Sequence, residues 1–397
     1  MFKRANNPLY WGKLDAISSA KFRNISNLKN VKESFFGSAP APFIGRYGYP
    51  RINVGILSPS EIMNDADNLD AQRQWAKNNL DIPEIVGFRS QLINSRDKAH
   101  VKDKNKLLEI AQEVALSKKA VDLEINLKKK PTLVFKTDPY LAPHAANAQI
   151  KSAVLADNPK IPRFADKIID DDLLANKQLI ELNKKFDEHY LSKILSVGLL
   201  GKEKSKKLVP TRWSITATDD TLGKNNISEI KQFRQNEEYL MHFGGYLGNY
   251  YAILFFPEIW SYELFEIYAG DSDDKGDYMT DHESYNGRKD YASNTVGGYY
   301  ACRLAITENI KEKKRQASVL ALRFITDEYT TPLGVWVVRE ATRKSLESNP
   351  ISFASKELMF SYLKYKINST FSLDVDKFLN LSKILTENKA QKKLFEF

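Results

Sequence analysis

Cysteine is almost absent from this 397-residue chain, which contains Cys302 and no other. A single thiol excludes a disulfide within the chain and any zinc site built from two or more of its own cysteines. The chain also lacks an apolar run of about 18 residues, and its N-terminus lacks the apolar core of a secretion signal. We therefore expect a cytoplasmic protein that neither enters a membrane nor is secreted.

The signatures of several large enzyme classes are missing as well. The sequence contains no Gly-x-Ser-x-Gly, no His-Glu-x-x-His, no Walker A loop and no glycine fingerprint of a dinucleotide-binding fold. These absences disfavour the common hydrolases, metalloproteases, nucleoside triphosphatases and dehydrogenases. An active site of another kind stays open, so the sequence does not decide whether the protein is an enzyme.

Positive charge is in modest excess. Lys and Arg number 59 against 50 Asp and Glu, and the resulting net charge of +9 favours polyanionic partners such as DNA through counterion release. Lysine-rich proteins that bind no nucleic acid carry the same balance. The first 32 residues are mostly basic, so we expect either an arm that contacts phosphates or a solvated lead-in packed by Leu9, Tyr10 and Trp11. Their charged residues are Lys3, Arg4, Lys13, Lys21, Arg23, Lys29 and Lys32, with the acid Asp15.

The spacing of apolar residues predicts alternating helices and strands. Residues 35–60 combine glycines and prolines with apolar residues, as short strands joined by tight turns do. Elsewhere apolar residues recur at helical spacing or alternate with polar ones. This predicts helices at 107–115, 173–200, 299–313 and from Thr331-Pro332 onward, and strands at 121–127, 213–217, 250–256, 260–264 and 319–325. The aspartate-rich stretch 271–290 is predicted to be a long loop.

These elements predict an α+β fold with mixed α and β structure, in which helices surround a large globular core of mixed sheet. Because single cores rarely exceed about 300 residues, we expect two closely packed lobes. The expected division is a basic arm at 1–32, lobes at 33–200 and 201–375, and a C-terminal helix with a tail at 376–397.

Several segments resemble one protein family. FGSAPAPFIGRYGYPRINVGILSP at 36–59, KLVPTRWSITATDD at 207–220, and the C-terminal blocks NGRKDYASNTVGGYYACRLA and EYTTPLGVWVVREATR are similar to segments of the archaeal Nre family of DNA-repair proteins. IVGFRSQLI at 85–93 and ALSKKAVDLEINLKKKP at 115–131 also resemble family segments. The resemblance covers most of the chain and implies a role in the repair of DNA damage, with DNA as a partner.

The N-terminus departs from that family's pattern. Many members begin with a four-cysteine segment that resembles a zinc finger, whereas residues 7–11 here are Asn-Pro-Leu-Tyr-Trp and contain no cysteine. The family's zinc site is therefore absent from this chain. No metal site is predicted, and the sequence identifies no cofactor.

The C-terminus keeps most of another family feature, a peptide that binds the DNA polymerase sliding clamp (PCNA). In such a peptide a glutamine bonds in a small polar pocket, while one turn of 3₁₀ helix presents an aliphatic and an aromatic residue to an apolar groove. Gln391, Leu394 and Phe397 fit these positions, although the final aromatic pair is one residue short. From the residues alone, a tail that folds back onto its own core is the alternative. The resemblance favours clamp binding through Gln391, Lys392, Lys393, Leu394, Phe395, Glu396 and Phe397.

An enzyme that processes a nucleotide or nucleic-acid phosphate is the alternative function. Its pocket would combine TRWSITATDD with the DHE, GRKDYA and GGYYA segments, around a metal or a phosphate. The catalytic candidates are Arg212, Asp219, Asp220, Asp281 and His282. Asp219 and Asp220 can share a ligand only in a turn, because neighbours on a strand point to opposite faces. A solvated turn and ordinary salt bridges remain open as the roles of these residues.

Arg46 and Tyr47 are candidates for contact with nucleic acid. A base can stack between a guanidinium plane and an aromatic ring, as it does in proteins that bind single strands. The same Tyr-Gly-Tyr pattern is also ordinary in packed turns.

A second candidate for phosphate binding is the start of the helix predicted at 299–313. Free backbone N–H groups at a helix start can receive a phosphate. Gly297 and Gly298 lie there, with Arg288 before them and Arg303 after them in the sequence. Glycines at a helix start also permit close packing against a sheet, which is the alternative role.

Overall fold

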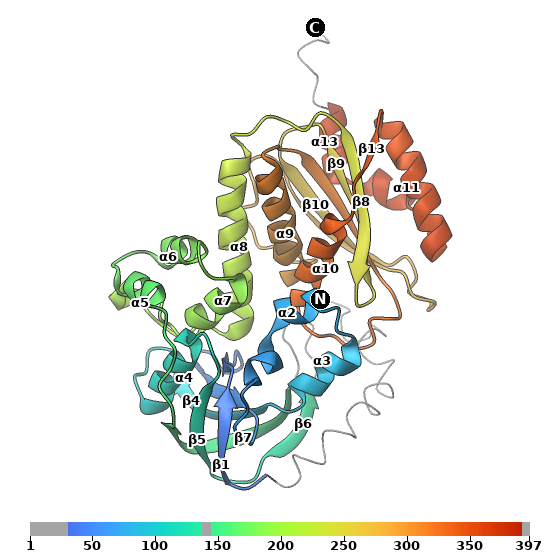
Figure 1. Ribbon diagram of the computed structural model, residues 1–397. Coiled ribbons are helices and arrows are strands. Elements are labelled where there is room, and N and C mark those ends of the chain that lie inside the picture. Colours follow the sequence, from blue (N-terminus) through green and yellow to red (C-terminus); the bar gives the residue numbers. More distant parts are fainter. Residues whose placement is uncertain (1–30, 137–143, 391–397) are drawn as a thin grey trace. The chain divides into compact units, whose positions relative to one another are not determined.

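Two mixed β-sheets organise the chain (Figure 1). The structure, a computed structural model, describes residues 31–136 and 144–390. The chain forms two compact units, one of residues up to Leu222 with Thr330–Gly334, the other of Gly223–Tyr329 with residues from Val335 onward. Each unit holds one sheet and its own helices, which confirms the predicted α+β fold.

Within the described residues, the sheet of the first unit has seven strands in the order β1-β5-β7-β4-β3-β2, with β6 pairing with β7. Neighbouring strands are antiparallel except β4 and β7, which run parallel. Its strands are β1 (Ser34–Ala39), β2 (Ala41–Ile44), β3 (Arg51–Ser58), β4 (Ile93–His100), β5 (Val121–Leu127), β6 (Thr132–Lys136) and β7 (His144–Leu155). Its helices are η3 (Ala66–Asp70), α2 (Gln72–Lys77), α3 (Ile82–Arg89), α4 (Lys106–Leu116), α5 (Arg163–Asp170), α6 (Ala175–Leu182), α7 (Glu188–Ser196), η4 (Glu203–Ser205) and the first part of α8 (Thr211–Ile230).

The burial pattern of β5 explains why this segment is a strand. Val121, Leu123, Ile125 and Leu127 are at most 4% exposed, whereas the polar residues between them are half-buried. Successive side chains of a strand point to opposite faces, so this alternation places one face of β5 in the core. The strand predicted at 121–127 is confirmed.

The sheet of the second unit, again within the described residues, has six strands in the order β11-β10-β12-β9-β8-β13. β10 and β12 are parallel, and the other neighbouring pairs are antiparallel. Its strands are β8 (Tyr239–Tyr246), β9 (Asn249–Phe256), β10 (Ser261–Tyr268), β11 (Tyr278–Glu283), β12 (Ser318–Ile325) and β13 (Ile351–Phe353). Its helices, after the end of α8, are α9 (Gly297–Lys313), α10 (Trp336–Glu347), α11 (Lys356–Phe371), α12 (Asp376–Leu381) and α13 (Lys383–Ala390).

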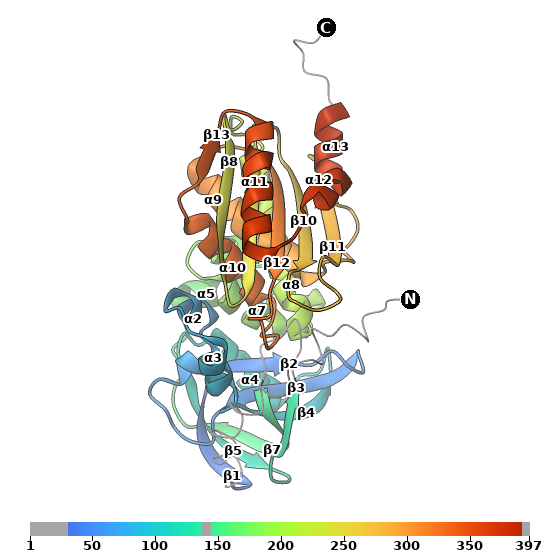
Figure 2. The same ribbon diagram turned by 90° about the vertical axis from the view of Figure 1, so that its right-hand side faces the viewer.

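Helices cover both faces of this second sheet. Figures 1 and 2 show α9 and α10 against one face and α11, α12 and α13 against the other. Between the sheet and the second group lies an apolar core, in which Phe256, Phe265 and Phe324 from the strands meet Leu363 and Phe371 from α11. Burial of large apolar side chains is the main force that holds such layers together.

Most of the other predicted elements are also found. The prediction of strands and turns at 35–60 is confirmed by β1, β2 and β3. The helical stretch 173–200 contains two helices, α6 and α7, rather than one. The remaining confirmed elements are the helices at 107–115 and 299–313 and the strands at 250–256, 260–264 and 319–325, which correspond to α4, α9, β9, β10 and β12.

The predicted strand at 213–217 is wrong, because this segment lies in the first half of α8. Ser214, Thr218 and Leu222 are at most 2% exposed, and their spacing of four residues is that of one helix face. Two of these three buried residues carry hydroxyl groups, so a prediction based on apolar residues misses the face. Asp219 and Asp220 consequently lie inside a helix and not in a turn that follows a strand.

The helix predicted from Thr331-Pro332 starts later than expected. α10 begins at Trp336, two residues after Gly334. Gly334 has a φ of 107°, which a helix does not accommodate. Thr331 and Pro332 therefore lie in the connection that precedes the helix.

The aspartate-rich stretch 271–290 is not one long loop. Tyr278–Glu283 forms β11, which pairs with β10 over its whole length. Asp281 and Glu283 of this strand are at most 5% exposed, so their carboxylates face the interior, where basic and N–H groups match them. A count of acidic residues cannot distinguish such a strand from a solvated loop.

Two predicted features lie outside the described residues. They are residues 1–30 of the basic arm and the tail 391–397. Within the described ranges, no helix combines the length and the apolar character that crossing a membrane requires.

Glu263, on β10, ties the last helix of the described chain to the second sheet. Its side chain is buried and accepts hydrogen bonds from the Ser382 hydroxyl (2.6 Å) and from the backbone N–H groups of Lys383 (3.1 Å) and Ile384 (3.3 Å). The first N–H groups of a helix have no partner inside it, so one carboxylate satisfies the start of α13. Burial raises the pKa of Glu263, although these donors act in the opposite direction.

The variant Glu263→Ala is expected to release the start of α13. The change leaves two backbone N–H groups and one hydroxyl without their acceptor, at a cost of about 1–3 kcal/mol in the free energy of unfolding. Urea unfolding measures this loss, and amide hydrogen exchange should become faster in α13. Glu237→Ala, whose side chain is 79% exposed, is the matched control and should change stability by less than about 1 kcal/mol. Unchanged exchange in α13 of the Glu263 variant would contradict this role.

Candidate functional site

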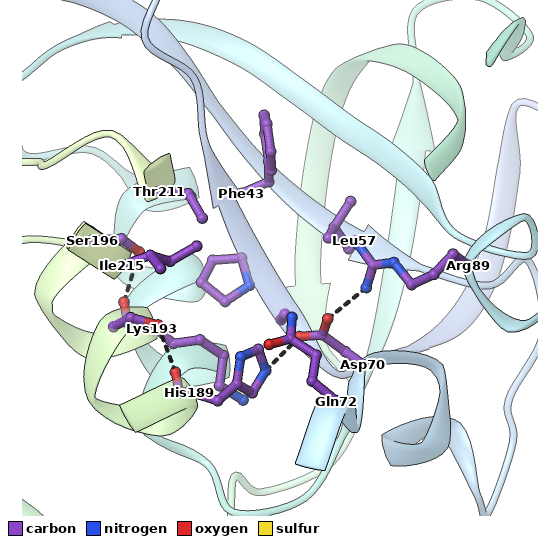
Figure 3. A pocket seen from close by; sticks show the side chains of 13 residues that line it. Phe43, Leu57, Asp70, Gln72, Arg89, His189, Lys193, Ser196, Thr211 and Ile215 are labelled. Atoms are coloured by element: carbon purple, nitrogen blue, oxygen red, sulfur yellow. Dashed lines mark hydrogen bonds and ion pairs between the residues drawn. The ribbon is translucent and has the colours of Figure 1, made fainter. Parts of the chain in front are cut away.

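Asp70, Arg89 and His189 form a charged cluster beside a small cavity in the first unit (Figure 3). Asp70 is the last residue of η3, Arg89 the last of α3, and His189 lies in the first turn of α7. One carboxylate oxygen of Asp70 lies 2.5 Å from Nη1 of Arg89, and the other lies 2.8 Å from Nε2 of His189. Three elements that are distant in the sequence thus meet at one carboxylate.

The charges around Asp70 keep it ionised. Burial by itself raises the pKa of this carboxyl, but the positive charges of His189 and Arg89 outweigh burial and lower the pKa to about 2. Arg89 is 3% exposed and also donates to the Leu69 carbonyl, so its guanidinium is held in place by two acceptors. The Asp70–Arg89 pair is therefore a fixed part of the interior.

His189 faces the cavity. Its side chain is 22% exposed, and the cavity of about 50 Å³ is also lined by Gln72, Lys193, Ser196 and Thr211. An aspartate that bonds to one ring nitrogen of a histidine fixes the orientation of the ring. The space holds little more than a water molecule or a small polar group. The arrangement can therefore bind a small polar ligand beside the His189 ring.

The sequence did not point to this cluster. Asp70 and His189 are 119 positions apart, so no spacing motif joins them. Arg89 lies within IVGFRSQLI, one of the segments that carry the family resemblance, which is the one signal for it in the sequence. Apolar periodicity gives no indication that a charged residue inside such a segment is buried.

Asp281 and Arg288 meet in the second unit. One carboxylate oxygen of Asp281 lies 3.2 Å from Arg288 Nη2, and the other accepts hydrogen bonds from the N–H groups of Asn294 and Thr295 and from the Thr295 hydroxyl. Arg288 also donates to the carbonyl of His282 (2.8 Å), and its guanidinium lies 5.3 Å from the ring centroid of Tyr299. These contacts fix the segment that joins β11 to α9.

Arg303 pairs with Glu283, the last residue of the DHE segment. Its Nη1 donates to Glu283 at 2.8 Å, and both side chains are 1% exposed. The guanidinium also lies 5.5 Å from the ring centroid of Tyr299 and 5.4 Å from that of Tyr300, within the range of cation–π attraction. Glu283 is two residues after Asp281, so both carboxylates point to the same face of β11.

His282 points away from these groups. It is paired across the sheet with Glu263, whereas Asp281 is paired with Leu264, and alternate residues of a strand face opposite sides. Its Nε2 lies 4.0 Å from a carboxylate oxygen of Glu387, on α13. Asp281 and His282 are therefore adjacent in the sequence, but their side chains lie on opposite faces of β11.

Gly297 and Gly298 begin α9, as the sequence predicts. A Cβ atom on Gly298 would lie 2.4 Å from a carboxylate oxygen of Glu266, which is on β10. The absence of a side chain thus lets α9 approach the sheet closely. The residue before them, Val296, has a φ of 51°, which is uncommon for a β-branched residue.

The remaining catalytic candidates lie on α8. Arg212, Asp219 and Asp220 all belong to the part of this helix that is in the first unit. Asp219 is 1% exposed and Asp220 is half-buried. The catalytic candidates are thus divided between the two units, three on α8 and two on β11.

Arg46 and Tyr47 lie together in the turn between β2 and β3. Arg46 Nη2 donates to the Tyr47 hydroxyl at 3.0 Å, and its guanidinium lies 4.7 Å from the centre of the Tyr47 ring. Tyr47 is 76% exposed. The pair therefore presents a stacked guanidinium and aromatic ring at the surface of the first unit.

Within residues 31–136 and 144–390, no three or more His, Cys, Asp and Glu side chains are arranged to hold a metal ion. Cys302 is buried in α9, and its burial raises the pKa of the thiol to about 11. A thiol of this kind is a weak nucleophile at neutral pH.

The variant Asp70→Asn is expected to destabilise the first unit. Without the carboxylate charge, the buried Arg89 loses its counter-charge, which should lower the free energy of unfolding by about 3–5 kcal/mol at neutral pH. Because the pKa of about 2 in the folded state lies below the ordinary 3.8, the stability that Asp70 contributes is present above about pH 4 and disappears as the pH falls towards 2. Urea unfolding at several pH values should show that the variant lacks this part of the acid-induced loss.

The control for this experiment is Asp172→Asn, whose side chain is 80% exposed. The free energy of unfolding of this control should have the same pH dependence as that of the unchanged protein. If the Asp70 variant lost stability in parallel with the unchanged protein between about pH 4 and 2, the carboxylate would not be the ionised centre of the cluster.

Comparison with known proteins supports the resemblance noted in the sequence. The profile of archaeal Nre, N-terminal, matches residues 16–273, and that of archaeal Nre, C-terminal, matches residues 283–397. Two proteins named DNA repair protein NreA, from Haloferax volcanii and Archaeoglobus fulgidus, are 34% and 36% identical to this chain over 78% and 84% of its length, and 77% and 85% of theirs. DNA repair protein NreB of Archaeoglobus fulgidus is 32% identical over 93% of both chains. No solved structure matches the chain significantly. With matches that span nearly all of its length, the chain belongs to the archaeal Nre family.

Proposed function

We propose that this protein is a DNA-repair factor that the sliding clamp recruits to DNA through residues 391–397. Relatives that cover most of the chain are named DNA repair proteins, which supports the repair role. The observation that carries the recruitment step is the sequence of the tail, where Gln391, Leu394 and Phe397 have the spacing of a clamp-binding peptide. The protein then works in the cytoplasm, on clamp-loaded DNA.

The position of the tail suits this role. It follows α13 directly in the sequence, and Glu263 together with the buried side chains of Ile384 and Leu385 holds α13 on the second sheet. A peptide attached to a well-held helix keeps the folded body close to whatever the peptide binds, and this raises the local concentration of the body on DNA. Lys392 and Lys393 favour an acidic rim on the clamp and so increase the rate of encounter.

We favour this recruitment role over the alternative function, in which the protein is an enzyme that processes nucleotides or nucleic-acid phosphates. In the second unit, the carboxylates of Asp281 and Glu283 are engaged by Arg288, Arg303 and the backbone around Thr295. Groups engaged in this way stabilise a fold, whereas a catalytic acid or base needs access to its substrate. His282, on the other face of β11, belongs to a different environment.

Removal of residues 391–397 is expected to abolish binding of the protein to the sliding clamp in a calorimetric titration. In the full-length chain, the double change Leu394→Ala and Phe397→Ala should weaken binding by at least about 100-fold, because buried apolar anchors carry most of the energy of such interfaces. Thermal unfolding of the variants should be unchanged. Leu381→Ala is the matched control, since this leucine is 44% exposed, lies on α12 and is outside the tail.

Two outcomes would overturn the proposed recruitment. Equal affinity of the full-length and shortened chains would place the clamp contact elsewhere. Absence of binding in both forms would remove the clamp as a partner and favour an independent enzyme.

A further inference from the structure

Three large aromatic side chains are exposed together on the first unit. Tyr47 and Tyr49, in the turn between β2 and β3, are 76% and 42% exposed, and Trp213, in the first turn of α8, is 45% exposed. The ring centroids of Tyr49 and Trp213 are 5.3 Å apart, with the ring planes inclined by 50°. We call these three residues the aromatic platform. Folding alone does not favour the exposure of so much aromatic surface, so a grouped set of this kind indicates an interaction site.

The backbone holds the aromatic platform in place. The N–H of Ile44 donates to the Thr211 hydroxyl at 2.9 Å, which joins the end of β2 to the start of α8. The N–H of Arg51 donates to the carbonyl of Gly48 at 2.8 Å, and Gly48 has a φ of 84°, which favours glycine. The turn that carries both tyrosines is thus closed on itself. A ligand that stacks on this turn meets a preorganised surface, so its binding costs little conformational entropy of the protein.

Basic residues continue from the aromatic platform along β3 and β4, which lie side by side (Figure 2). The cross-strand pairs are Arg51 with His100, Asn53 with Lys98, and Gly55 with Arg96. Directly paired residues share a face of the sheet, as do residues two positions apart on one strand. Arg51, Lys98 and Arg96 therefore line one face, and we call them the basic strip. It begins two residues after Tyr49.

The charge of the basic strip is not balanced locally. Among the residues that the structure describes, Arg51, Arg96 and Lys98 form no ion pair. The one acid on these two strands, Asp97, faces the opposite side, where it contacts Lys128 (3.5 Å). Gly55 has no side chain to cover its partner Arg96. A strip of this kind attracts a polyanion through its phosphates.

We propose that the aromatic platform and the basic strip together bind single-stranded DNA. Bases stack on the exposed rings, and the phosphates of the same strand follow Arg51, Lys98 and Arg96. The Arg46 guanidinium, already 4.7 Å from the Tyr47 ring centre, extends the stacking surface. A duplex keeps its bases stacked on one another and offers no base face to these rings, and an acidic peptide offers charge without bases. The site therefore fits a strand with accessible bases, a partner that the proposed repair function supplies.

The test is fluorescence anisotropy with a labelled oligothymidine of roughly 12 nucleotides, a length within the site sizes of single-strand binding folds. Trp213→Ala and Tyr47→Ala should each weaken binding by roughly 5- to 150-fold, the range that loss of one base-stacking contact produces. Trp213→Phe should retain most of the affinity because it keeps a ring. Tyr365→Ala is the matched control, since Tyr365 is 71% exposed on α11 of the second unit, and should leave binding unchanged.

Salt dependence tests the basic strip separately. Lys98→Ala should reduce the slope of log affinity against log salt by about 0.7, the value for one phosphate contact on a single strand. Lys106→Ala, whose side chain is 72% exposed on α4, should leave the slope as it is.

Several results would overturn the inference. They are unchanged affinity in both Trp213→Ala and Tyr47→Ala, a duplex of equal length that binds as tightly as the single strand, or polyglutamate that competes as well as oligothymidine. Each measurement is made with the full-length chain and with the chain shortened after Ala390, in the absence of the clamp. If the full-length chain bound oligothymidine but not the clamp, the recruitment proposal alone would be refuted. If the full-length chain bound the clamp through its tail but did not bind oligothymidine, this inference alone would be refuted.

Discussion

Buried carboxylates must be matched by donors, and this constraint shapes both units. Asp70 joins η3, α3 and α7, Glu283 joins β11 to α9, and Glu266 on β10 pairs with Arg323 on β12 at 2.5 Å. An ionised group in a protein interior is strongly unfavourable without a partner, and a partner with good geometry offsets much of this cost. Each pair therefore permits only the arrangement of segments in which its members meet. Apolar burial provides most of the stability of the layers, and each ion pair joins segments that are distant in the sequence.

Elements whose burial depends on apolar side chains could be predicted from the sequence, and elements buried through polar side chains could not. β5 alternates Val, Leu, Ile and Leu with polar residues and was predicted with its boundaries. α8 buries Ser214 and Thr218 on one face, so its first half was predicted as a strand. β11 buries the carboxylates of Asp281 and Glu283, and because acidic residues are usually exposed, a loop was predicted in its place. The buried carboxylates of β11 are matched by Arg288, Thr295 and Arg303, which lie outside the strand, whereas the Ser214 hydroxyl of α8 donates to the Thr211 carbonyl of the same helix.

The same reasoning explains what the sequence could predict about candidate sites. Arg288, Gly297, Gly298 and Arg303 are close in the chain, and the structure places them around one strand end and helix start, so local sequence was enough to group them. Asp70 and His189 belong to elements that meet only in the folded unit, and nothing in the spacing of either residue indicates the other. Trp213 next to Tyr49 is a case of the same kind, since the turn and the helix that carry them are far apart in the chain.

The proposed recruitment by the clamp and the proposed stacking of a single strand assign different parts of the protein, the tail and the surface of the first unit. The central claim is that residues 391–397 alone make the clamp contact. The most direct measurement is competition, in which a synthetic peptide of residues 388–397 is titrated into a complex of the full-length protein with the sliding clamp. The account predicts complete displacement of the protein at saturating peptide. A plateau, with protein still bound when the peptide occupies every clamp site, would contradict it.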